Sequence, residues 1–322
     1  MQHGIRPLLK KLYFVRRVKH GTAIRIGETV PGRAMEMEDE DGTLARLLTL
    51  MDGTRTIDQI YEGWKREGAE ETKQDLEDII VELDELGLLD DASAAERSGL
   101  DSIDQERYKA NLHYFSLYSR IGSSVFEMQE KLLRARITVI GAGTLGSGVL
   151  FNLACLGVGT VRIVDFDTVE RSNLNRQMLY NEADLGKRKT EAAAEFLRRF
   201  HSRLKVEAID MRIMSAESAK QAIAGSDAVV LAADQPHVHL ERWVNQACCA
   251  LNIPFITGGV HISEAQFYTV IPGFTGCIAC NDLIQNKLDA SRQSFLHDVL
   301  ESGFRLPSTA IAAHYMLLIG AI

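Results

Sequence analysis

The chain has few cysteines and no long apolar run, and these absences argue against a secreted disulfide scaffold and an integral membrane protein. Its 322 residues include five cysteines, and none of them indicates the disulfide framework of a small secreted domain. No segment resembles a signal peptide, and no apolar run has the roughly 20 residues that a membrane-spanning helix needs. We therefore predict a cytoplasmic protein with no membrane partner.

The chain is also short of positive charge. Lys and Arg number 36 against 44 Asp and Glu, which gives a net charge of −8. The shortage is greatest between Glu70 and Asp91, where ten acidic residues accompany one lysine, Lys73. Because affinity for nucleic acid depends on cations that neutralise phosphates, we predict no nucleic-acid partner.

A glycine-rich turn follows a short apolar run in the middle of the chain. Ile137–Ile140 predicts a buried parallel strand, and Gly141, Gly143 and Gly146 follow it in the pattern G-x-G-x-x-G. Glycines allow a tight turn that a phosphate can approach closely. The helix expected at Leu145–Leu156 would direct its N-terminal amides at that phosphate. This pattern predicts a Rossmann-like α/β domain with a mostly parallel sheet.

A second predicted strand, Thr160–Val164, ends at Asp165, where an acidic residue is placed to bind ribose hydroxyls. The amide and cationic side chains that follow are Asn173, Arg176, Gln177, Lys187, Arg188 and Lys189. Arg and Lys bind phosphate oxygens, and a triphosphate needs several of them. A dinucleotide pyrophosphate is bound mostly by backbone amides. The cluster therefore favours ATP over the nicotinamide cofactor of a dehydrogenase.

These motifs, in this order, resemble the ThiF/MoeB/HesA superfamily of ATP-dependent adenylating enzymes, which is related to ubiquitin-activating enzymes. The resemblance covers residues 106–322. Within the superfamily, the chain is most similar to adenylyltransferases that modify the microcin C precursor peptide. The segments that carry this similarity are ERYKANLHYFS, EMQEKLLRARITVIG, VVLAADQPHVHLERWVN and VIPGFTGCIAC. Such enzymes activate a peptide or protein carboxylate as an acyl-adenylate and work as homodimers. The resemblance therefore implies this reaction and a homodimer here.

The resemblance also implies roles for residues at matching positions. The implied nucleotide-binding residues are Gly141, Gly143, Gly146, Asp165, Asn173, Arg176 and Lys189. The implied catalytic residues are Arg176, Lys189 and Asp234. Asp234 follows the predicted strand Ala228–Leu231 and would hold Mg²⁺, which prefers carboxylate and phosphate oxygens.

The sequence departs from the family pattern at two positions. Thr144 stands where the family often has glycine, and Ala110 replaces the second arginine of a segment that often reads R-Y-x-R-Q. In the family this segment reaches the ATP of the partner subunit, and Lys109 or Arg107 could substitute here. The departures favour an alternative, a ThiF-like protein without ATP chemistry that presents a precursor peptide to another enzyme. The presence of Arg176, Lys189 and Asp234 argues against it.

Cys277 and Cys280 form a C-x-x-C pair in a turn-rich setting typical of a zinc knuckle. One pair supplies half of a four-cysteine site, and the related enzymes have a second pair nearer the C-terminus. Because the apolar helix-like run from Ala310 has no stop signal before Ile322, we expect the natural protein to continue and to carry that pair. Structural Zn²⁺ is therefore the prediction, with a redox C-x-x-C as the alternative. Cys155 is expected in the core, and Cys248 and Cys249 are expected to pack within a helix.

The first hundred residues predict a small winged-helix domain of three strands and three helices. The strands are expected at Leu12–Val18, Thr22–Ile26 and near Arg33–Met37, and the helices at Thr43–Met51, Thr56–Glu67 and Thr72–Leu86. A polar stretch at residues 93–105 is the predicted linker. It would separate a domain at residues 1–92 from the adenylation domain at residues 106–322.

This small domain resembles the PqqD-like recognition domain of enzymes that modify ribosomally made peptides, in part through LMDGTRTIDQI. Such domains bind a leader peptide as an added strand beside their third strand and against their last helix. The resemblance therefore implies a ribosomally made precursor peptide as the partner. The acidic last helix would favour a leader with basic residues. A structural cap or dimerisation arm is the alternative.

Together these patterns predict a two-domain enzyme of natural-product biosynthesis. Its N-terminal domain would bind the leader, and its α/β domain would bind Mg·ATP and adenylate a peptide carboxylate, releasing pyrophosphate. Two further alternatives are a sulfur-carrier adenylyltransferase and an NAD-dependent dehydrogenase. The extra N-terminal domain argues against the first, and the cationic cluster behind Asp165 argues against the second.

Overall fold

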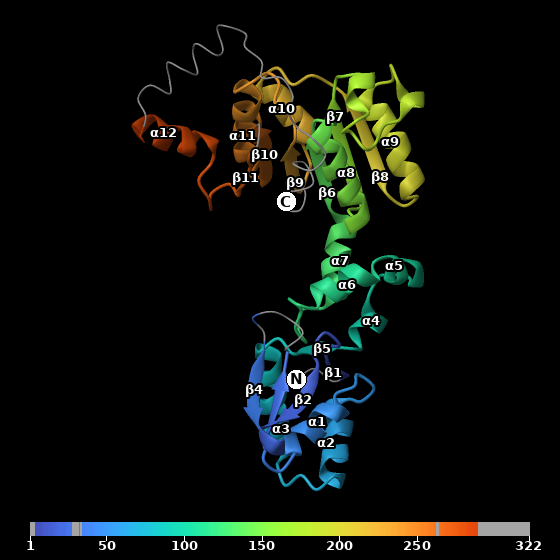
Figure 1. Ribbon diagram of the computed structural model, residues 1–322, viewed down its shortest axis with the longest axis vertical. Coiled ribbons are helices and arrows are strands. Elements are labelled where there is room, and N and C mark those ends of the chain that lie inside the picture. Colours follow the sequence, from blue (N-terminus) through green and yellow to red (C-terminus); the bar gives the residue numbers. More distant parts are fainter. Residues whose placement is uncertain (1–3, 28–31, 33, 262–263, 289–322) are drawn as a thin grey trace. The chain divides into compact units, whose positions relative to one another are not determined.

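The computed structural model describes residues 4–27, 32, 34–261 and 264–288, and the chain forms two compact units, residues 1–131 and 132–322 (Figure 1). The linker predicted at residues 93–105 contains helix α4 (Ala94–Arg97) and the beginning of α5 (Ser102–Arg107). The division at residue 131 therefore places residues 106–131 with the N-terminal unit. The independent folding of residues 1–92 stays a prediction.

The N-terminal unit contains a three-stranded antiparallel sheet in the order β2 (Val15–Val18), β3 (Ala23–Ile26) and β4 (Met35–Glu38). All three strands lie within or beside the predicted segments. Side chains along β4 alternate between half-buried Met and exposed Glu, as expected for a strand with one face on the core. A second sheet joins β1 (Pro7–Leu9) to β5 (Leu89–Asp91), a pairing that the sequence did not predict.

Three helices cover this sheet, at the predicted positions: α1 (Thr43–Leu50), α2 (Ile57–Arg66) and α3 (Lys73–Glu85). Thr56 and Thr72 begin α2 and α3 with capping boxes, which satisfy amides that the first turn leaves unpaired. On α3, Leu76, Ile80 and Leu83 are buried in the core. The small winged-helix unit predicted from the sequence is confirmed.

The rest of the N-terminal unit is helical. It contains α4, α5, α6 (Lys109–Phe115) and the first part of α7 (Val125–Arg134). Lys10 ties this part to the winged helix, because its buried amine donates hydrogen bonds to the carbonyl oxygens of Gly87 at 2.8 Å and Ser119 at 2.7 Å. A buried ammonium needs such acceptors.

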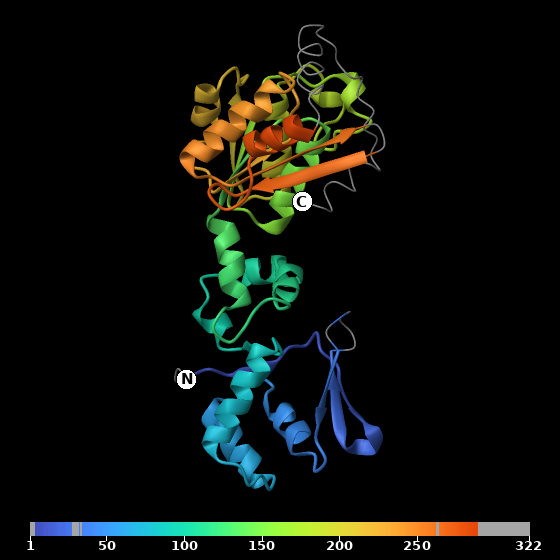
Figure 2. The ribbon, with the colours of Figure 1, turned by 90° about the vertical axis from the view of Figure 1, so that its left-hand side faces the viewer.

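The C-terminal unit is built on a six-stranded sheet in the order β11-β10-β9-β6-β7-β8. Its strands are β6 (Arg136–Ile140), β7 (Thr160–Asp165), β8 (Lys205–Asp210), β9 (Ala228–Leu231), β10 (Phe255–His261) and β11 (Glu264–Val270). All are parallel except β11, which pairs antiparallel with β10 at the sheet edge, as Figure 2 shows in orange. The order reverses between β6 and β9, where open α/β sheets bind their ligands.

Helices cover both faces of this sheet. They are α8 (Thr144–Leu156), α9 (Lys189–Phe200), α10 (Ala216–Ile223) and α11 (His239–Leu251). Helix α12 (Ile278–Leu288) follows β11 and packs on α11. One hydrophobic core gathers residues of α8 and α9, and another gathers residues of α10 and α11. Because both faces are buried, the central strands β6 and β9 are mostly apolar. The predicted Rossmann-like class is confirmed.

The apolar run from Ala310 lies outside the described residues. In the described part of the chain, no helix combines the length and the apolar character needed to cross a bilayer.

Candidate nucleotide site

The glycine turn lies at the carboxyl end of β6, and two of its glycines are required by close packing. Gly141 has a φ of +99°, and a Cβ there would lie 2.6 Å from the carbonyl oxygen of Ala232. At Gly146 a Cβ would lie 1.9 Å from the carbonyl oxygen of Gly141. Gly143 differs, since the nearest atom to its hypothetical Cβ is Nε2 of Gln177 at 3.9 Å. The turn is therefore open at Gly143, where a phosphate could approach the backbone.

Asp165 is held by the turn itself. Its Oδ2 accepts a hydrogen bond from the amide of Ala142 at 2.7 Å, and its Oδ1 accepts one from the amide of Asp167 at 2.8 Å. A carboxylate has about four acceptor positions, so these two bonds orient the group and leave capacity for ribose hydroxyls.

Lys189 begins α9 and reaches the same loop. Its side chain is buried, and its Nζ lies 3.1 Å from Oδ2 of Asp167. Its amide also donates to the carbonyl oxygen of Asp167 at 2.9 Å. The structure thus brings Lys189 and Asp165 together through Asp167, a residue that the sequence did not single out. Asp167 is the counterion of the buried Lys189 ammonium, and burying that charge without a partner would destabilise the fold.

Tyr180 joins the two sides of this loop and was also missed. Its hydroxyl donates to the carbonyl oxygen of Ala142 at 2.7 Å and lies 3.4 Å from that of Lys189. Burial, followed by the nearby charges of Asp165 and Asp167, raises the pKa of Tyr180. The hydroxyl therefore stays protonated and acts as a fixed donor. The sequence holds no local signal for this role, because the contact with Ala142 spans 38 residues.

The segment after β7 supplies the remaining polar groups. Asn173 ends a short 3-10 helix (Arg171–Asn173), and its buried Oδ1 accepts from the amide of Glu170 at 3.0 Å. One guanidinium nitrogen of Arg176 donates to the carbonyl oxygen of Ser172 at 2.6 Å. In the described part of the chain, Arg176 Nε and Gln177 Oε1 are buried without hydrogen-bond partners. Such orphaned groups cost about 1–3 kcal/mol each, so a polar ligand that paired with them would be favoured.

The other two predicted cations bind protein carboxylates. Lys187 pairs with Glu195 at 2.9 Å and Asp184 at 3.1 Å, and these hydrogen bonds raise its pKa. Arg188 pairs with Asp210 at 2.9 Å. Lys189 is paired as well, with Asp167, but that pair adjoins Asp165 beside the glycine turn, and Arg176 forms no ion pair with a described residue. Lys189 and Arg176 are therefore the better candidates for phosphate contacts.

Asp234 lies in the loop after β9, which packs against the glycine turn at Ala232. Its side chain is exposed and forms no hydrogen bond or ion pair with any described residue. A carboxylate at this position fits Mg²⁺, which keeps several waters and takes few protein ligands.

Cys277 and Cys280 stand at the start of α12, with their sulfur atoms 3.8 Å apart. Two thiolates bound tetrahedrally at 2.3 Å would be separated by about this distance. Hydrogen bonding to the backbone of Cys280 lowers the pKa of the Cys277 thiol, which favours the thiolate that a metal binds. However, the described residues contain no group of three or more His, Cys, Asp or Glu side chains that could hold a metal. The zinc assignment is therefore not shown.

The sequence model of the ThiF family matches residues 112–319. The SAMP-activating enzyme E1 of Haloferax volcanii is 36% identical over 174 residues, which cover 54% of this chain and 60% of that enzyme. The sulfur carrier protein ThiS adenylyltransferase of Bacillus subtilis is 40% identical over 166 residues, 51% of this chain and 48% of that protein. The chain thus spans about half of the length of these curated relatives.

Crystal structures of E. coli MccB share the fold over nearly the whole chain. The structure with MccA-N7isoASN has a TM-score of 0.74 at 23% identity, and the match covers 98% of this chain and 86% of that one. The structure with ATP has a TM-score of 0.71, also at 23% identity, and covers 98% and 85%. These matches extend over both units, whereas the curated relatives match about half of the chain.

Proposed function

Because this chain belongs to the ThiF family, we propose that it is an ATP-dependent adenylyltransferase that activates a carboxylate of a ribosomally made precursor peptide. One carboxylate oxygen attacks the α-phosphorus of ATP, a new P–O bond forms, and the bond to pyrophosphate breaks. No protein nucleophile is needed, so the protein contributes positioning and electrostatic stabilisation. The observation that carries the proposal is the open glycine turn beside Asp165 and the Lys189–Asp167 pair.

Each polar group of this site has a task in the proposal. Asp165 orients the ribose, while Lys189 and Arg176 neutralise charge that grows on the phosphate oxygens. Asn173 would add a further contact to the phosphates, and Gln177, whose Nε2 lies near Gly143, could do so as well. Asp234 would hold Mg²⁺, which supplies further neutralisation of phosphate charge when bound.

The N-terminal unit is the reason to propose a peptide substrate. MccB structures match this chain through that unit and include complexes with MccA, whereas the curated sulfur-carrier relatives match about half of the chain. In the proposal, the winged helix binds the leader while the C-terminal unit modifies the core. Tethering raises the effective concentration of the core at the active site. Two copies would form a homodimer, and Cys277 with Cys280 would contribute half of a structural zinc site.

ATP–pyrophosphate exchange tests the proposal. The probe is a synthetic peptide encoded by any short open reading frame that flanks the gene. We expect exchange that requires both this peptide and Mg²⁺. Asp234→Asn should lower the exchange rate at least about 100-fold, since removing one strong electrostatic contact commonly costs that much. Peptide affinity should stay within twofold. Unchanged exchange in the variant would refute the metal role, and exchange without peptide would refute the peptide substrate.

Two other functions give different results in the same assay. The sequence identity to ThiS adenylyltransferase favours a sulfur carrier protein as substrate, and exchange driven by such a protein and not by the peptide would establish it. Ala110 and Thr144 favour a peptide presenter without ATP chemistry. Tight peptide binding with no exchange would establish that function.

A further inference from the structure

Tyr180 fixes the middle of the glycine turn from inside the protein. Its hydroxyl donates to the carbonyl oxygen of Ala142 at 2.7 Å, and the amide of Ala142 donates to Oδ2 of Asp165 at 2.7 Å. The two peptide groups that flank Ala142 are therefore each held by one side chain. Tyr180 is 7% exposed and its hydroxyl is already bound to the backbone, so it acts on the turn and not on a ligand.

The bond from Tyr180 also sets the direction of the Gly143 amide. Ala142 and Gly143 share a trans peptide group, which is planar, so its C=O and N–H bonds point in opposite directions. The Gly143 amide therefore points away from Tyr180. Rotation of this peptide group would turn both bonds together, and the hydrogen bond from Tyr180 opposes that rotation.

The amide that points away from Tyr180 is available to a ligand. No described residue accepts a hydrogen bond from it. Gly143 is also the open position of the turn, where the nearest atom to a hypothetical Cβ is 3.9 Å away. Because Gly143 directly precedes α8, the helix dipole favours an anion at this amide. A phosphate oxygen is therefore the acceptor that fits it.

The Tyr180 hydroxyl lies near the start of α9 as well. It is 3.4 Å from the carbonyl oxygen of Lys189, the residue that begins this helix. The aromatic ring is packed in the core that contains residues of α8 and α9. One rigid side chain therefore connects the peptide group of the Gly143 amide to the helix that carries the Lys189 ammonium.

Resting on the nucleotide site of the proposed function, we infer that Tyr180 is a positioning residue for the phosphates of ATP. It holds the Gly143 amide in the direction from which it donates to a phosphate oxygen, at a fixed separation from Lys189. A donor that is oriented before the ligand arrives needs no reorganisation on binding. A phenylalanine would keep the packing of the ring and lose control of this peptide group.

Calorimetric titration of the full chain with Mg·ATP and, separately, with adenosine tests this role. Adenosine separates the two cases because it has the base and the ribose but no phosphates. Tyr180→Phe should weaken ATP binding about tenfold, the effect of about one hydrogen bond, and adenosine binding less than twofold. Equal losses for the two ligands, as a merely structural role would give, would overturn the inference. So would unchanged affinity for ATP.

Tyr13→Phe is the matched control. Tyr13 is 6% exposed and lies in the core of the N-terminal unit, and no described residue forms a hydrogen bond with its hydroxyl. The substitution thus removes an equally buried phenol hydroxyl that holds no part of the glycine turn. Affinity for both ligands should stay within twofold. A tenfold loss of ATP affinity here too would contradict a specific role for Tyr180.

Gly143→Ala tests the same contact from the ligand side. Its φ of −78° suits alanine, and the added methyl has room in the protein, but it would lie where the phosphate approaches. ATP affinity should fall about tenfold. In this background Tyr180→Phe should cost less than a further twofold, because the contact that it positions is already lost. Losses that multiply in the double variant would overturn the inference.

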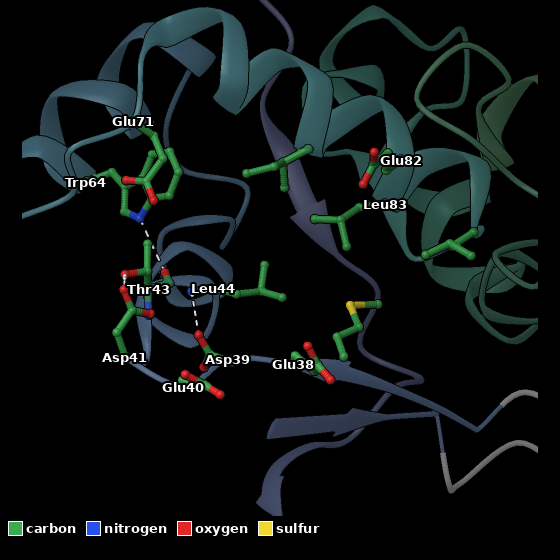
Figure 3. Close-up of a pocket in the computed structure, with 13 residues that line it drawn as sticks. Glu38, Asp39, Glu40, Asp41, Thr43, Leu44, Trp64, Glu71, Glu82 and Leu83 are labelled. Atoms are coloured by element: carbon green, nitrogen blue, oxygen red, sulfur yellow. Dashed lines mark hydrogen bonds between the residues drawn. The ribbon is translucent and has the colours of Figure 1, made fainter. Parts of the chain in front are cut away.

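Peptide affinity shows whether the effect is confined to the nucleotide. In the proposed function the leader binds the winged helix, which has a pocket of about 350 Å³ between β4, the beginning of α1 and α3 (Figure 3). Tyr180 and Gly143 belong to the other unit. Both variants should therefore bind the peptide within twofold of the unchanged protein, and a parallel loss of peptide affinity would overturn the positioning role.

The two proposals fail separately. Peptide-dependent exchange of pyrophosphate, with unchanged ATP affinity in Tyr180→Phe, would refute the positioning role and leave the adenylation proposal standing. A selective loss of ATP affinity in Tyr180→Phe, with no exchange by the unchanged protein under any condition, would refute adenylation and leave the positioning role standing.

Discussion

Two glycines of the nucleotide turn have no room for a side chain, whereas the third has room. Gly141 and Gly146 are packed against backbone atoms, and Gly143 is open. A glycine motif therefore combines two needs, close packing of α8 against the turn and access for a ligand. The sequence shows all three glycines equally, and only the surrounding atoms separate the two needs.

Gly146→Ala should destabilise the protein by about 1–3 kcal/mol, because its Cβ would meet backbone that cannot move without shifting the turn. Its added methyl would lie 1.9 Å from the carbonyl oxygen of Gly141. Gly122→Ala is the control, since nothing lies within 4 Å of its hypothetical Cβ. Urea denaturation, with and without ATP, measures the free energy of unfolding of both variants. Equal stability of the two variants would contradict the packing argument.

The sequence motifs predicted Lys189 and Asp165 as site residues, and the structure places both at the ends of the connection between β7 and α9. The sequence could not predict that Asp167 pairs with Lys189 or that Tyr180 donates to the carbonyl oxygen of Ala142. Those contacts join residues 22 and 38 positions apart. Local pattern carries no information on which side chains meet across such a distance.

At the scale of elements, the turn between α1 and α2 shows how a short motif fixes a connection. Asp52 accepts from the amide of Thr54 at 2.9 Å and from its hydroxyl at 2.6 Å, and it pairs with Arg55 at 2.6 Å. These bonds, that of the Thr54 hydroxyl first, lower the pKa of Asp52 to about 2.

Asp52→Asn should lower the free energy of unfolding at pH 7 by about 1 kcal/mol, a value reduced for the exposure of the side chain. Because the folded-state pKa is depressed, the stabilisation is present above the unfolded value of 3.8 and is lost as the pH falls through about 2. Denaturation at several pH values should show the two proteins converging in acid. Glu62→Gln is the charge control, and a difference for Asp52→Asn that is constant with pH would contradict the expectation.

The start of α12 makes Cys277 the most reactive described thiol if no metal is bound. Its pKa is lowered, whereas desolvation raises the pKa of Cys155, an exposed residue of α8 that the sequence had placed in the core. Iodoacetamide followed by mass spectrometry should label Cys277 before Cys155 in metal-free protein. If zinc is bound as proposed, labelling of Cys277 should be slow until a chelator is added. Zinc-free protein with fast labelling from the outset would contradict the zinc assignment.

At the scale of the whole molecule, the N-terminal unit extends beyond the winged helix. Lys10 donates to Ser119, and the hydroxyl of Ser119 donates to Asp90, whose pKa is raised by burial. These contacts join the winged helix to residues that follow the predicted linker. A boundary at residue 92 would cut through this polar network.

A fragment of residues 1–131 should therefore be more stable than a fragment of residues 1–92. Removing Ser119 leaves Lys10 and Asp90 without one partner each, and we expect the shorter fragment to lose about 1–3 kcal/mol. Urea unfolding followed by circular dichroism measures the difference. Equal stability would show that residues 93–131 add nothing to the winged helix.

The sequence by itself determined the classes of both units, the positions of α1–α3 and the glycine turn, because hydrophobic period, capping residues and glycine patterns act over a few residues. Only the tertiary structure decided that β1 pairs with β5, that Asp167 meets Lys189, and that Tyr180 donates to the carbonyl oxygen of Ala142. These features depend on segments distant in the chain. Packing of the cores brings such segments together, and no local pattern records where they meet.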